Sequence, residues 1–205
     1  MLTIINYGIG NLASIQNMLK RIGVEALVSS REEDLQRATK IILPGVGAFD
    51  TCASKLHHTG LIPLLNKKVK EDKTPLLGIC VGMQLLLEGS EEGKLPGLGW
   101  MKGRNVKFDT SRLPDNHKIP HMSWSDVSVA KPSALTQGLG DDARFYFVHS
   151  YHASVTEQQD ILMEAEYGYQ FTAAVAHENI FGVQFHPEKS HRFGMQLLEN
   201  FCTKI

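Results

Sequence analysis

The 205-residue chain has few cysteines, almost no net charge and no long hydrophobic run. Its three cysteines stand singly, without a Cys-x-x-Cys pair, which argues against a disulfide framework and against a structural zinc site. Lysines and arginines number 21 and aspartates and glutamates 22, so the formal net charge is −1. This balance gives no electrostatic reason to bind nucleic acid or an anionic membrane surface, and it favours a small ligand.

No segment has the length of a membrane span, and the apolar run over residues 2–6 is too short for a signal peptide. The unpaired cysteines, together with the lack of a membrane span and of a signal peptide, predict a cytoplasmic location. We expect one domain over residues 1–205, because a chain of this length can bury roughly 70% of its unfolded surface in a single core.

Apolar segments alternate with helical patterns in the first 90 residues. Strands are predicted over residues 2–6, 24–28, 40–43 and 75–80. One helix is predicted over residues 11–22 and a short one after Ser30, which would cap it. Helical segments are also expected between the third strand and about residue 70, and directly after residue 80. This alternation is typical of βαβ units, which form a parallel sheet with helices on both faces. Functional residues are then expected at the carboxyl ends of the strands.

The pattern changes from Leu95 onward to short segments separated by Gly- and Pro-rich turns. Further strands are predicted over residues 105–108, 125–129, 144–148, 161–165, 173–176 and 180–185, and a closing helix over 194–201. The expected fold class is therefore α/β, a three-layer sandwich with a largely parallel central sheet and appended antiparallel strands.

Cys80 lies between two glycines, in Gly78-Ile79-Cys80-Val81-Gly82, where an apolar strand pattern changes to a helical one. This is the thiol form of a nucleophile elbow, in which small neighbours allow a sharp turn that exposes the reactive atom. Free N–H groups of the first helical turn favour the thiolate, which is the species that attacks carbonyls. A buried structural cysteine is the alternative interpretation.

His186 and Glu188 could complete a catalytic triad. A strand over residues 182–185 would carry His186 at its end, and Pro187 would fix a turn that returns Glu188 to the imidazole. A thiolate nucleophile needs such a base and a group that orients it. Taken alone, this triplet is also compatible with an ordinary surface turn.

Pro44-Gly45-Val46-Gly47 ends the strand expected next to the cysteine strand. The glycines leave the backbone N–H groups of Val46 and Gly47 free to face an oxyanion, and the N–H of Val81 would supply a second donor. An ordinary strand-to-helix turn would also explain this sequence.

Five motifs follow one another along the chain: Asn6-Tyr7-Gly8-x-Gly10-Asn11, Pro44-Gly45-Val46-Gly47, Leu77-Gly78-Ile79-Cys80-Val81-Gly82-Met83-Gln84, Val148-His149-Ser150-Tyr151 and Gln184-Phe185-His186-Pro187-Glu188-Lys189-Ser190. In this combination the chain resembles, over nearly its whole length, the glutaminase subunits of imidazole glycerol phosphate synthase. These subunits form a family within the class I, triad-type glutamine amidotransferases.

The resemblance implies hydrolysis of L-glutamine, with no cofactor and no metal. It assigns Cys80 as nucleophile, His186 as general base and acid, and Glu188 as its orienting partner. It also implies that the substrate is bound by Gln84, Gly47 and the backbone of Ser150 and Tyr151.

The family's partner is a (β/α)₈-barrel cyclase in a heterodimer, which uses the ammonia to form imidazole glycerol phosphate and an aminoimidazole carboxamide ribotide. We expect Asn11, Trp124 and Lys189 on the partner side. Where the family usually has Gly-Trp-Asn, this chain has Ser123-Trp124-Ser125. A paralogous subunit that feeds ammonia to a surface-sugar enzyme is therefore an alternative.

The residues also fit two other functions. Gly8-Ile9-Gly10 with Ala13, and Arg31 after the second strand, also fit a dinucleotide-binding fingerprint, but this function leaves the cysteine elbow unexplained. A cysteine hydrolase of peptides or esters would use the same triad. Neither His57-His58 nor the pair His149 and His152 has a third ligand at metal-binding spacing.

Overall fold

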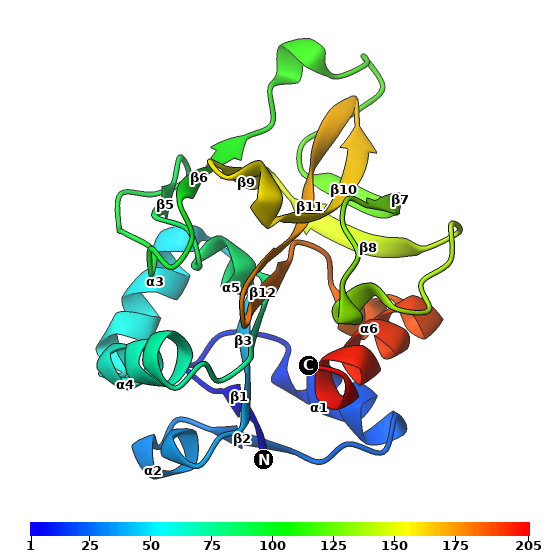
Figure 1. Ribbon diagram of the computed structural model, residues 1–205. Coiled ribbons are helices and arrows are strands. Elements are labelled where there is room, and N and C mark those ends of the chain that lie inside the picture. The colour runs from blue at the N-terminus through cyan, green and yellow to red at the C-terminus, as the bar shows by residue number, and fades with distance from the viewer.

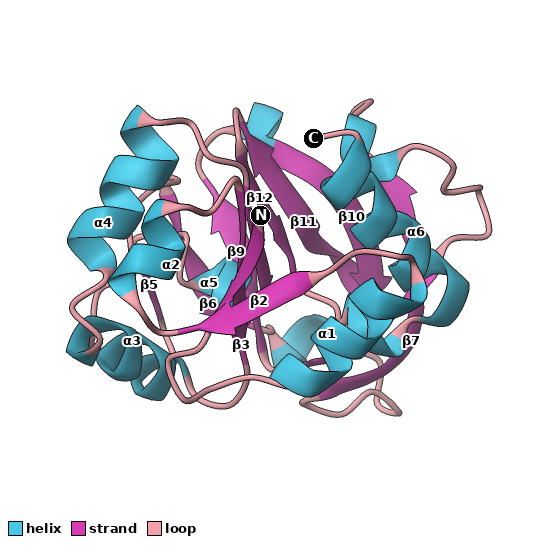
Figure 2. Cartoon of the chain, turned by 90° about the horizontal axis from the view of Figure 1, so that it is seen from below, coloured by secondary structure: helices cyan, strands magenta, loops and turns pink.

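The computed structural model describes all residues from Met1 to Ile205. Its strands form one 12-stranded sheet, whose main path runs β2-β1-β3-β4-β12-β11-β10-β7-β8, with β9, β6 and β5 branching from β11. The sheet forms the middle of the molecule, with helices on either side (Figures 1 and 2). No helix is both long enough and apolar enough to span a membrane.

Five neighbouring strands at one end of the sheet run parallel. They are β2 (Ala26–Ser29), β1 (Leu2–Ile5), β3 (Lys40–Gly45), β4 (Leu76–Cys80) and β12 (Ile180–Val183). Every residue of β1, β4 and β12 is buried, as expected for strands covered on both faces. Their carboxyl ends point towards the antiparallel strands, which rise above them in Figure 1.

The antiparallel part continues the sheet beyond β12. It contains β11 (Tyr169–His177), β10 (Ile161–Tyr167), β7 (His121–Val129), β8 (Arg144–His149), β9 (Tyr151–Val155) and β6 (Gly103–Lys107), and the short β5 (Gly89–Ser90) pairs parallel with β6. The predicted α/β sandwich, with a parallel centre and appended antiparallel strands, is confirmed.

Helices cover both faces of the parallel strands (Figure 2). On one side lie α1 (Leu12–Arg21) and α6 (His191–Thr203), and on the other α2 (Glu32–Gln36), α3 (Phe49–His58), α4 (Ile62–Asn66) with its π-helical extension Lys67–Glu71, and α5 (Val81–Gln84). In α1 the residues that face the core are spaced three or four apart, as an amphipathic helix requires: Ile15, Met18 and Leu19. One continuous hydrophobic cluster joins the parallel and antiparallel parts.

The structure corrects several local predictions. Ser30 does not cap α2, because the neighbouring Ser29 Oγ accepts from Arg31 N at 3.0 Å and donates to Asp34 Oδ2 at 2.6 Å. The last parallel strand ends at Val183 and not at residue 185. Strand β9 was not predicted at all, since its sequence Tyr-His-Ala-Ser-Val carries little apolar alternation.

The helix expected after Cys80 is also shorter than its apolar pattern indicates. It ends at Gln84, and the following N–H groups of Leu86 and Leu87 bond to carbonyls three residues back. The active-site elbow is therefore followed by a single helical turn.

Candidate active site

Cys80 is the last residue of β4 and directly precedes α5, in the strand, turn and helix arrangement predicted for it. Its backbone has φ 55° and ψ −114°, a conformation that non-glycine residues rarely adopt. Such strain is typical of functional sites, where the surrounding structure holds the residue in place. The side chain is almost buried, with 4% of its surface exposed.

Close backbone contacts explain the glycines around Cys80. A Cβ atom on Gly82 would lie 1.9 Å from the Leu43 carbonyl oxygen, and one on Gly78 would lie 2.6 Å from the Gly82 oxygen. A Cβ on Gly45 would lie 2.4 Å from the Gly82 nitrogen. Real Cβ atoms do not approach so closely, so the ends of β3 and β4 and the start of α5 meet only because these residues are glycines.

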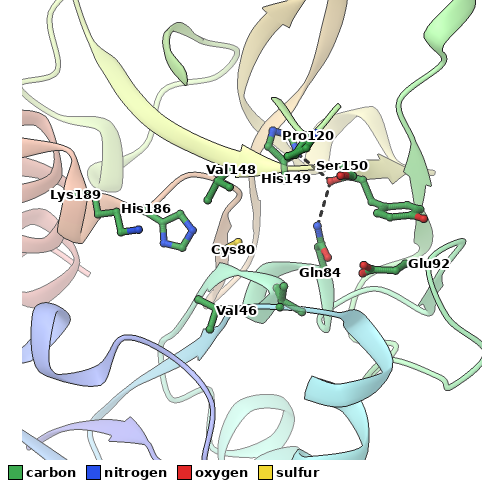
Figure 3. Close-up of a pocket in the computed structure, with 13 residues that line it drawn as sticks. Val46, Cys80, Gln84, Glu92, Pro120, Val148, His149, Ser150, His186 and Lys189 are labelled. Atoms are coloured by element: carbon green, nitrogen blue, oxygen red, sulfur yellow. Dashed lines mark hydrogen bonds between the residues drawn. The ribbon is translucent and has the colours of Figure 1, made fainter. Parts of the chain in front are cut away.

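His186 lies three residues beyond the end of β12, close to Cys80 (Figure 3). Its Nδ1 is 2.8 Å from Oε1 of Glu188, and both side chains are buried. Burial alone would lower the pKa of His186, but the Cys80 sulfur and the Glu188 carboxylate outweigh it and raise the pKa to about 10. His186 is therefore held as an imidazolium beside the Cys80 sulfur and the Glu188 side chain.

Cys80 and His186 border a pocket of about 340 Å³ at the carboxyl ends of β3 and β4. The predicted site residues that line it are Val46, Gly47, Cys80, Val81, Gln84, Ser150, Tyr151, His186 and Lys189. In Figure 3, Lys189 and His186 lie on one side of Cys80, and Gln84, Ser150 and Glu92 on the other. The pocket is thus an elongated site with the sulfur between its two ends.

The N–H groups of Val46 and Gly47 make no hydrogen bond within the chain. Gly47 has φ +89°, which explains why a glycine occupies this position. Beneath the loop, the thiol of Cys52 donates to the Val46 carbonyl oxygen at 3.4 Å. Val81 is the first residue of α5, where N–H groups have no partner within the helix. Val46, Gly47 and Val81, which are predicted to supply the oxyanion donors, all line the pocket.

Gln84 is tied to its surroundings through its amide nitrogen, which donates to the Tyr151 carbonyl at 3.1 Å and to Gln184 Oε1 at 3.0 Å. Gln184 in turn places its own amide nitrogen 3.8 Å from the Cys80 sulfur. The sequence did not single out Gln184, because its neighbours predict only a buried strand. The N–H of Ser150 makes no hydrogen bond within the chain.

Glu92 is a further pocket residue that the sequence analysis missed. Its Oε2 accepts from the N–H of Phe49, the first residue of α3, at 2.9 Å. The loop that carries Glu92 is held by Asp50, which accepts the backbone N–H groups of Lys94 and Leu95 at 2.9–3.0 Å. The sequence feature that could have indicated Glu92 is an acidic residue in a Gly- and Ser-containing loop soon after the Cys80 turn.

The three residues predicted on the partner side lie at different places. Lys189 borders the pocket and lies 5.5 Å from the ring of Tyr146. Trp124 is 39% exposed and stacks on His191, with ring centres 5.4 Å apart. Asn11 precedes α1, and its side chain makes no capping hydrogen bond.

The turn over Gly8-Ile9-Gly10 has a structural explanation that needs no dinucleotide. Both glycines have positive φ, and a Cβ on Gly10 would lie 2.9 Å from Pro44. Lys55 Nζ donates to the Gly8 carbonyl at 3.2 Å. No group of three or more histidine, cysteine, aspartate or glutamate side chains is arranged to hold a metal ion.

Residues 3–205 match the family described as glutamine amidotransferase class-I. The chain belongs to this family. It is 52% identical to "Imidazole glycerol phosphate synthase subunit HisH 2" of Methanococcus maripaludis and 48% identical to the protein of that name in Pseudomonas aeruginosa, with 100% of both chains covered in each case. These relatives confirm the resemblance to the glutaminase subunits of this synthase and place the chain in the HisH branch.

A solved structure described as PurLQS from Thermotoga maritima superposes with a TM-score of 0.75, at 18% identity, and covers 99% of this chain and 97% of its own. At that identity the likeness concerns the fold alone. A second solved structure, described as a glutamine amidotransferase, superposes with a TM-score of 0.72 at 21% identity and covers 97% of this chain and 96% of its own.

Proposed function

We propose that the chain hydrolyses L-glutamine to glutamate and ammonia with Cys80, His186 and Glu188 as its catalytic triad. The observation that carries the proposal is the strained Cys80 on the floor of a pocket, beside an imidazole that a buried carboxylate orients. Membership of the class I glutamine amidotransferases supports the same activity. Residues 1–205 act as one glutamine amidotransferase domain in this proposal.

The first half of the reaction breaks the amide bond. The Cys80 thiolate adds to the side-chain carbonyl carbon of glutamine, and N–H groups of Val81 and of Val46 or Gly47 stabilise the oxyanion. His186, as the imidazolium, donates its proton to the departing nitrogen, so that ammonia leaves and a glutamyl thioester remains on Cys80.

The second half regenerates the enzyme. Neutral His186 accepts a proton from water while the water oxygen adds to the thioester carbonyl. Collapse of the second tetrahedral intermediate expels the Cys80 thiolate and releases glutamate. Glu188 holds Nδ1 of His186 throughout, which keeps Nε2 directed at the reacting atoms.

The amino-acid end of glutamine binds on the Gln84 side of the pocket. Its ammonium group has acceptors in the carboxylate of Glu92 and the amide oxygen of Gln84, and its carboxylate has a donor in the unpaired Ser150 N–H. The backbone of Tyr151 completes this wall. Ammonia then forms on the opposite side, near His186 and Lys189.

The consumer of the ammonia lies on another protein. The names of the relatives support a cyclase of imidazole glycerol phosphate synthase as that partner, in a heterodimer and in histidine biosynthesis. Exposed Val46, Met122 and Trp124 supply apolar contacts for it. A cytoplasmic location suits such a pathway. A surface-sugar enzyme fed by a paralogous subunit remains the alternative, favoured only by Ser123 and Ser125 at the family's Gly and Asn positions.

The test measures glutamate and ammonia released from glutamine in the presence of the candidate cyclase. The unaltered chain is expected to release both in equal amounts, and Cys80→Ala to release neither while it remains folded. Cys202→Ala is the matched control and should remain active. Full activity in Cys80→Ala would contradict the proposal, and glutaminase activity that needs a surface-sugar enzyme instead would support the alternative partner.

A further inference from the structure

A chain of hydrogen bonds runs through two buried histidines to the wall of the pocket. Ser123 and Ser125 place their hydroxyls 3.0 Å and 2.8 Å from Nε2 of His121. Nδ1 of His121 is 3.0 Å from Nε2 of His149, and Nδ1 of His149 is 2.9 Å from the Tyr151 carbonyl oxygen.

Only one arrangement of protons fits this chain when both rings are neutral. A carbonyl oxygen can only accept, so His149 must carry its proton on Nδ1, which leaves its Nε2 as an acceptor. His121 must then carry its proton on Nδ1, and its Nε2, which has one lone pair, accepts from a serine hydroxyl. Burial lowers the pKa of His121 to about 4 and that of His149 well below its usual value, so both rings are neutral near pH 7.

The inner end of this chain lies at a sharp corner. β8 ends at His149 and β9 begins at Tyr151, so Ser150 alone joins two strands that pair with different neighbours. The Tyr151 carbonyl receives two donors, His149 Nδ1 and the amide of Gln84. The orientation of Gln84 therefore depends on the same carbonyl that His149 holds.

Packing prevents the first ring from turning. His121 lies between Phe147 and Tyr167, stacked on both, with ring centres 5.0 Å and 4.1 Å away. It also faces His149 directly across the β7–β8 pair. The ring can therefore hold a fixed hydrogen-bond direction without help from solvent.

We propose that His121 and His149 are positioning residues for glutamine binding, which fix the Ser150–Tyr151 corner and the Gln84 amide through a single, directed proton arrangement. The inference rests on the proposed function for its kinetic consequence, but not for its proton arrangement. In this proposal Ser123 and Ser125 have a role, because their hydroxyls form the outer end of the hydrogen-bond chain.

The first test reads the proton positions in the unaltered protein. Nitrogen chemical shifts from two-bond ¹H–¹⁵N spectra distinguish a protonated from a bare imidazole nitrogen. We expect both His121 and His149 to carry the proton on Nδ1 with Nε2 bare. A proton on Nε2 of His149 would overturn the proposal, whether or not the protein hydrolyses glutamine.

The second test compares KM and kcat of three variants in the same assay. His121→Phe keeps the ring packing but leaves Nε2 of His149 without a donor, and we expect the KM for glutamine to rise about 10-fold with a smaller change in kcat. His121→Asn retains an N–H near the Nδ1 position and should recover most of the KM. The control, His152→Phe, lies in the same aromatic cluster, but the His152 side chain hydrogen-bonds to Ala153 and Tyr169 and not to the Tyr151 carbonyl or Gln84.

Equal KM values for His121→Phe and His152→Phe in an active enzyme would overturn the positioning role. An unaltered protein that hydrolyses no glutamine would instead contradict the proposed function, and the nitrogen spectra would still decide the proton arrangement.

Discussion

At the scale of single residues, the site depends on three ionisable groups whose charges stabilise one another. Cys80 and His186 attract each other across the pocket floor, and Glu188 holds the imidazolium from behind at 2.8 Å. The other two cysteines are different in kind, because burial raises the pKa of Cys52 and of Cys202 to about 11. Cys52 and Cys202 are therefore poor nucleophiles near neutral pH, and neither lines the pocket beside His186 as Cys80 does.

The raised pKa of His186 predicts how activity and stability depend on pH. The imidazolium persists well above its usual pKa of 6.5, so its stabilisation of the fold is fully present below about pH 6.5 and is lost as the pH rises through about 10. His186 loses its proton in the same alkaline range, and it can then no longer protonate the departing nitrogen of glutamine. We therefore expect glutaminase activity to fall near pH 10.

Glu188→Gln should move that alkaline limb to lower pH, because the amide keeps an acceptor for Nδ1 but removes the negative charge that helps to raise the pKa of His186. Its rate at neutral pH should fall less than that of His186→Ala, which loses acid and base catalysis together, typically about 10²- to 10⁴-fold. A pH series of kcat/KM tests this, with the exposed Glu199→Gln as control. An unshifted alkaline limb in Glu188→Gln would contradict the account.

The sequence identified some of these residues and not others. Cys80 stands out because its glycine neighbours are required by contacts within the same short segment. Glu92 and His149 line the pocket, and the Gln184 amide lies 3.8 Å from the Cys80 sulfur. Each is held by a tertiary contact: Glu92 to the start of α3, His149 to β7 and Gln184 to Gln84. Local sequence carries no signal of such contacts.

At the scale of elements, the ends of β3 and β4 and the first turn of α5 form one close-packed unit. The unit determines both the conformation of Cys80 and the place of the oxyanion donors. Strands β1, β3 and β4 were predictable because each is an almost continuous buried run followed by a helical pattern. Strand β9 and the end of β12 depend on pairing with distant strands, so their sequences alone did not define them.

Gly82→Ala should disrupt this unit, since its Cβ would lie 1.9 Å from the Leu43 carbonyl oxygen. Overpacking of this kind typically costs about 1–3 kcal/mol, and here the shift would also displace the Cys80 sulfur. We expect a lower unfolding temperature and a loss of glutaminase activity larger than the loss of folded protein explains.

The matched control is Gly89→Ala, whose Cβ would meet only Arg104 side-chain atoms at 3.7 Å or more. The unfolding temperature and the steady-state glutaminase kinetics are measured for both variants and compared. If Gly82→Ala behaved like Gly89→Ala, the close packing would have no role in the site.

At the scale of the whole molecule, the pocket opens beside the surface that we propose for the cyclase. Val46, which carries a candidate oxyanion donor, is itself 37% exposed on that side. The peptide before Val46 lies between glycines and makes no hydrogen bond through its N–H, so a bound partner could select its orientation. A single missing oxyanion donor typically costs about 10²- to 10³-fold in rate.

We therefore expect glutamate production to rise by about that factor when the cyclase and its own ligand are present. Asn11→Ala should reduce the stimulation but leave basal turnover, because the Asn11 side chain makes no capping hydrogen bond that α1 would lose. Asn17→Ala, on the exposed side of α1, is the control. An isolated chain that hydrolyses glutamine as fast as the liganded complex would refute this mode of control but not the triad.

The central claim is that Cys80 is the nucleophile that attacks glutamine. The most direct measurement treats the complex with a diazo-ketone analogue of glutamine and locates the label on the three cysteines by peptide mass spectrometry. The account predicts a label on Cys80 alone, formed in step with loss of glutaminase activity and prevented by excess glutamine. A label on Cys52 or Cys202 that accompanies inactivation, or inactivation that leaves Cys80 unmodified, would contradict it.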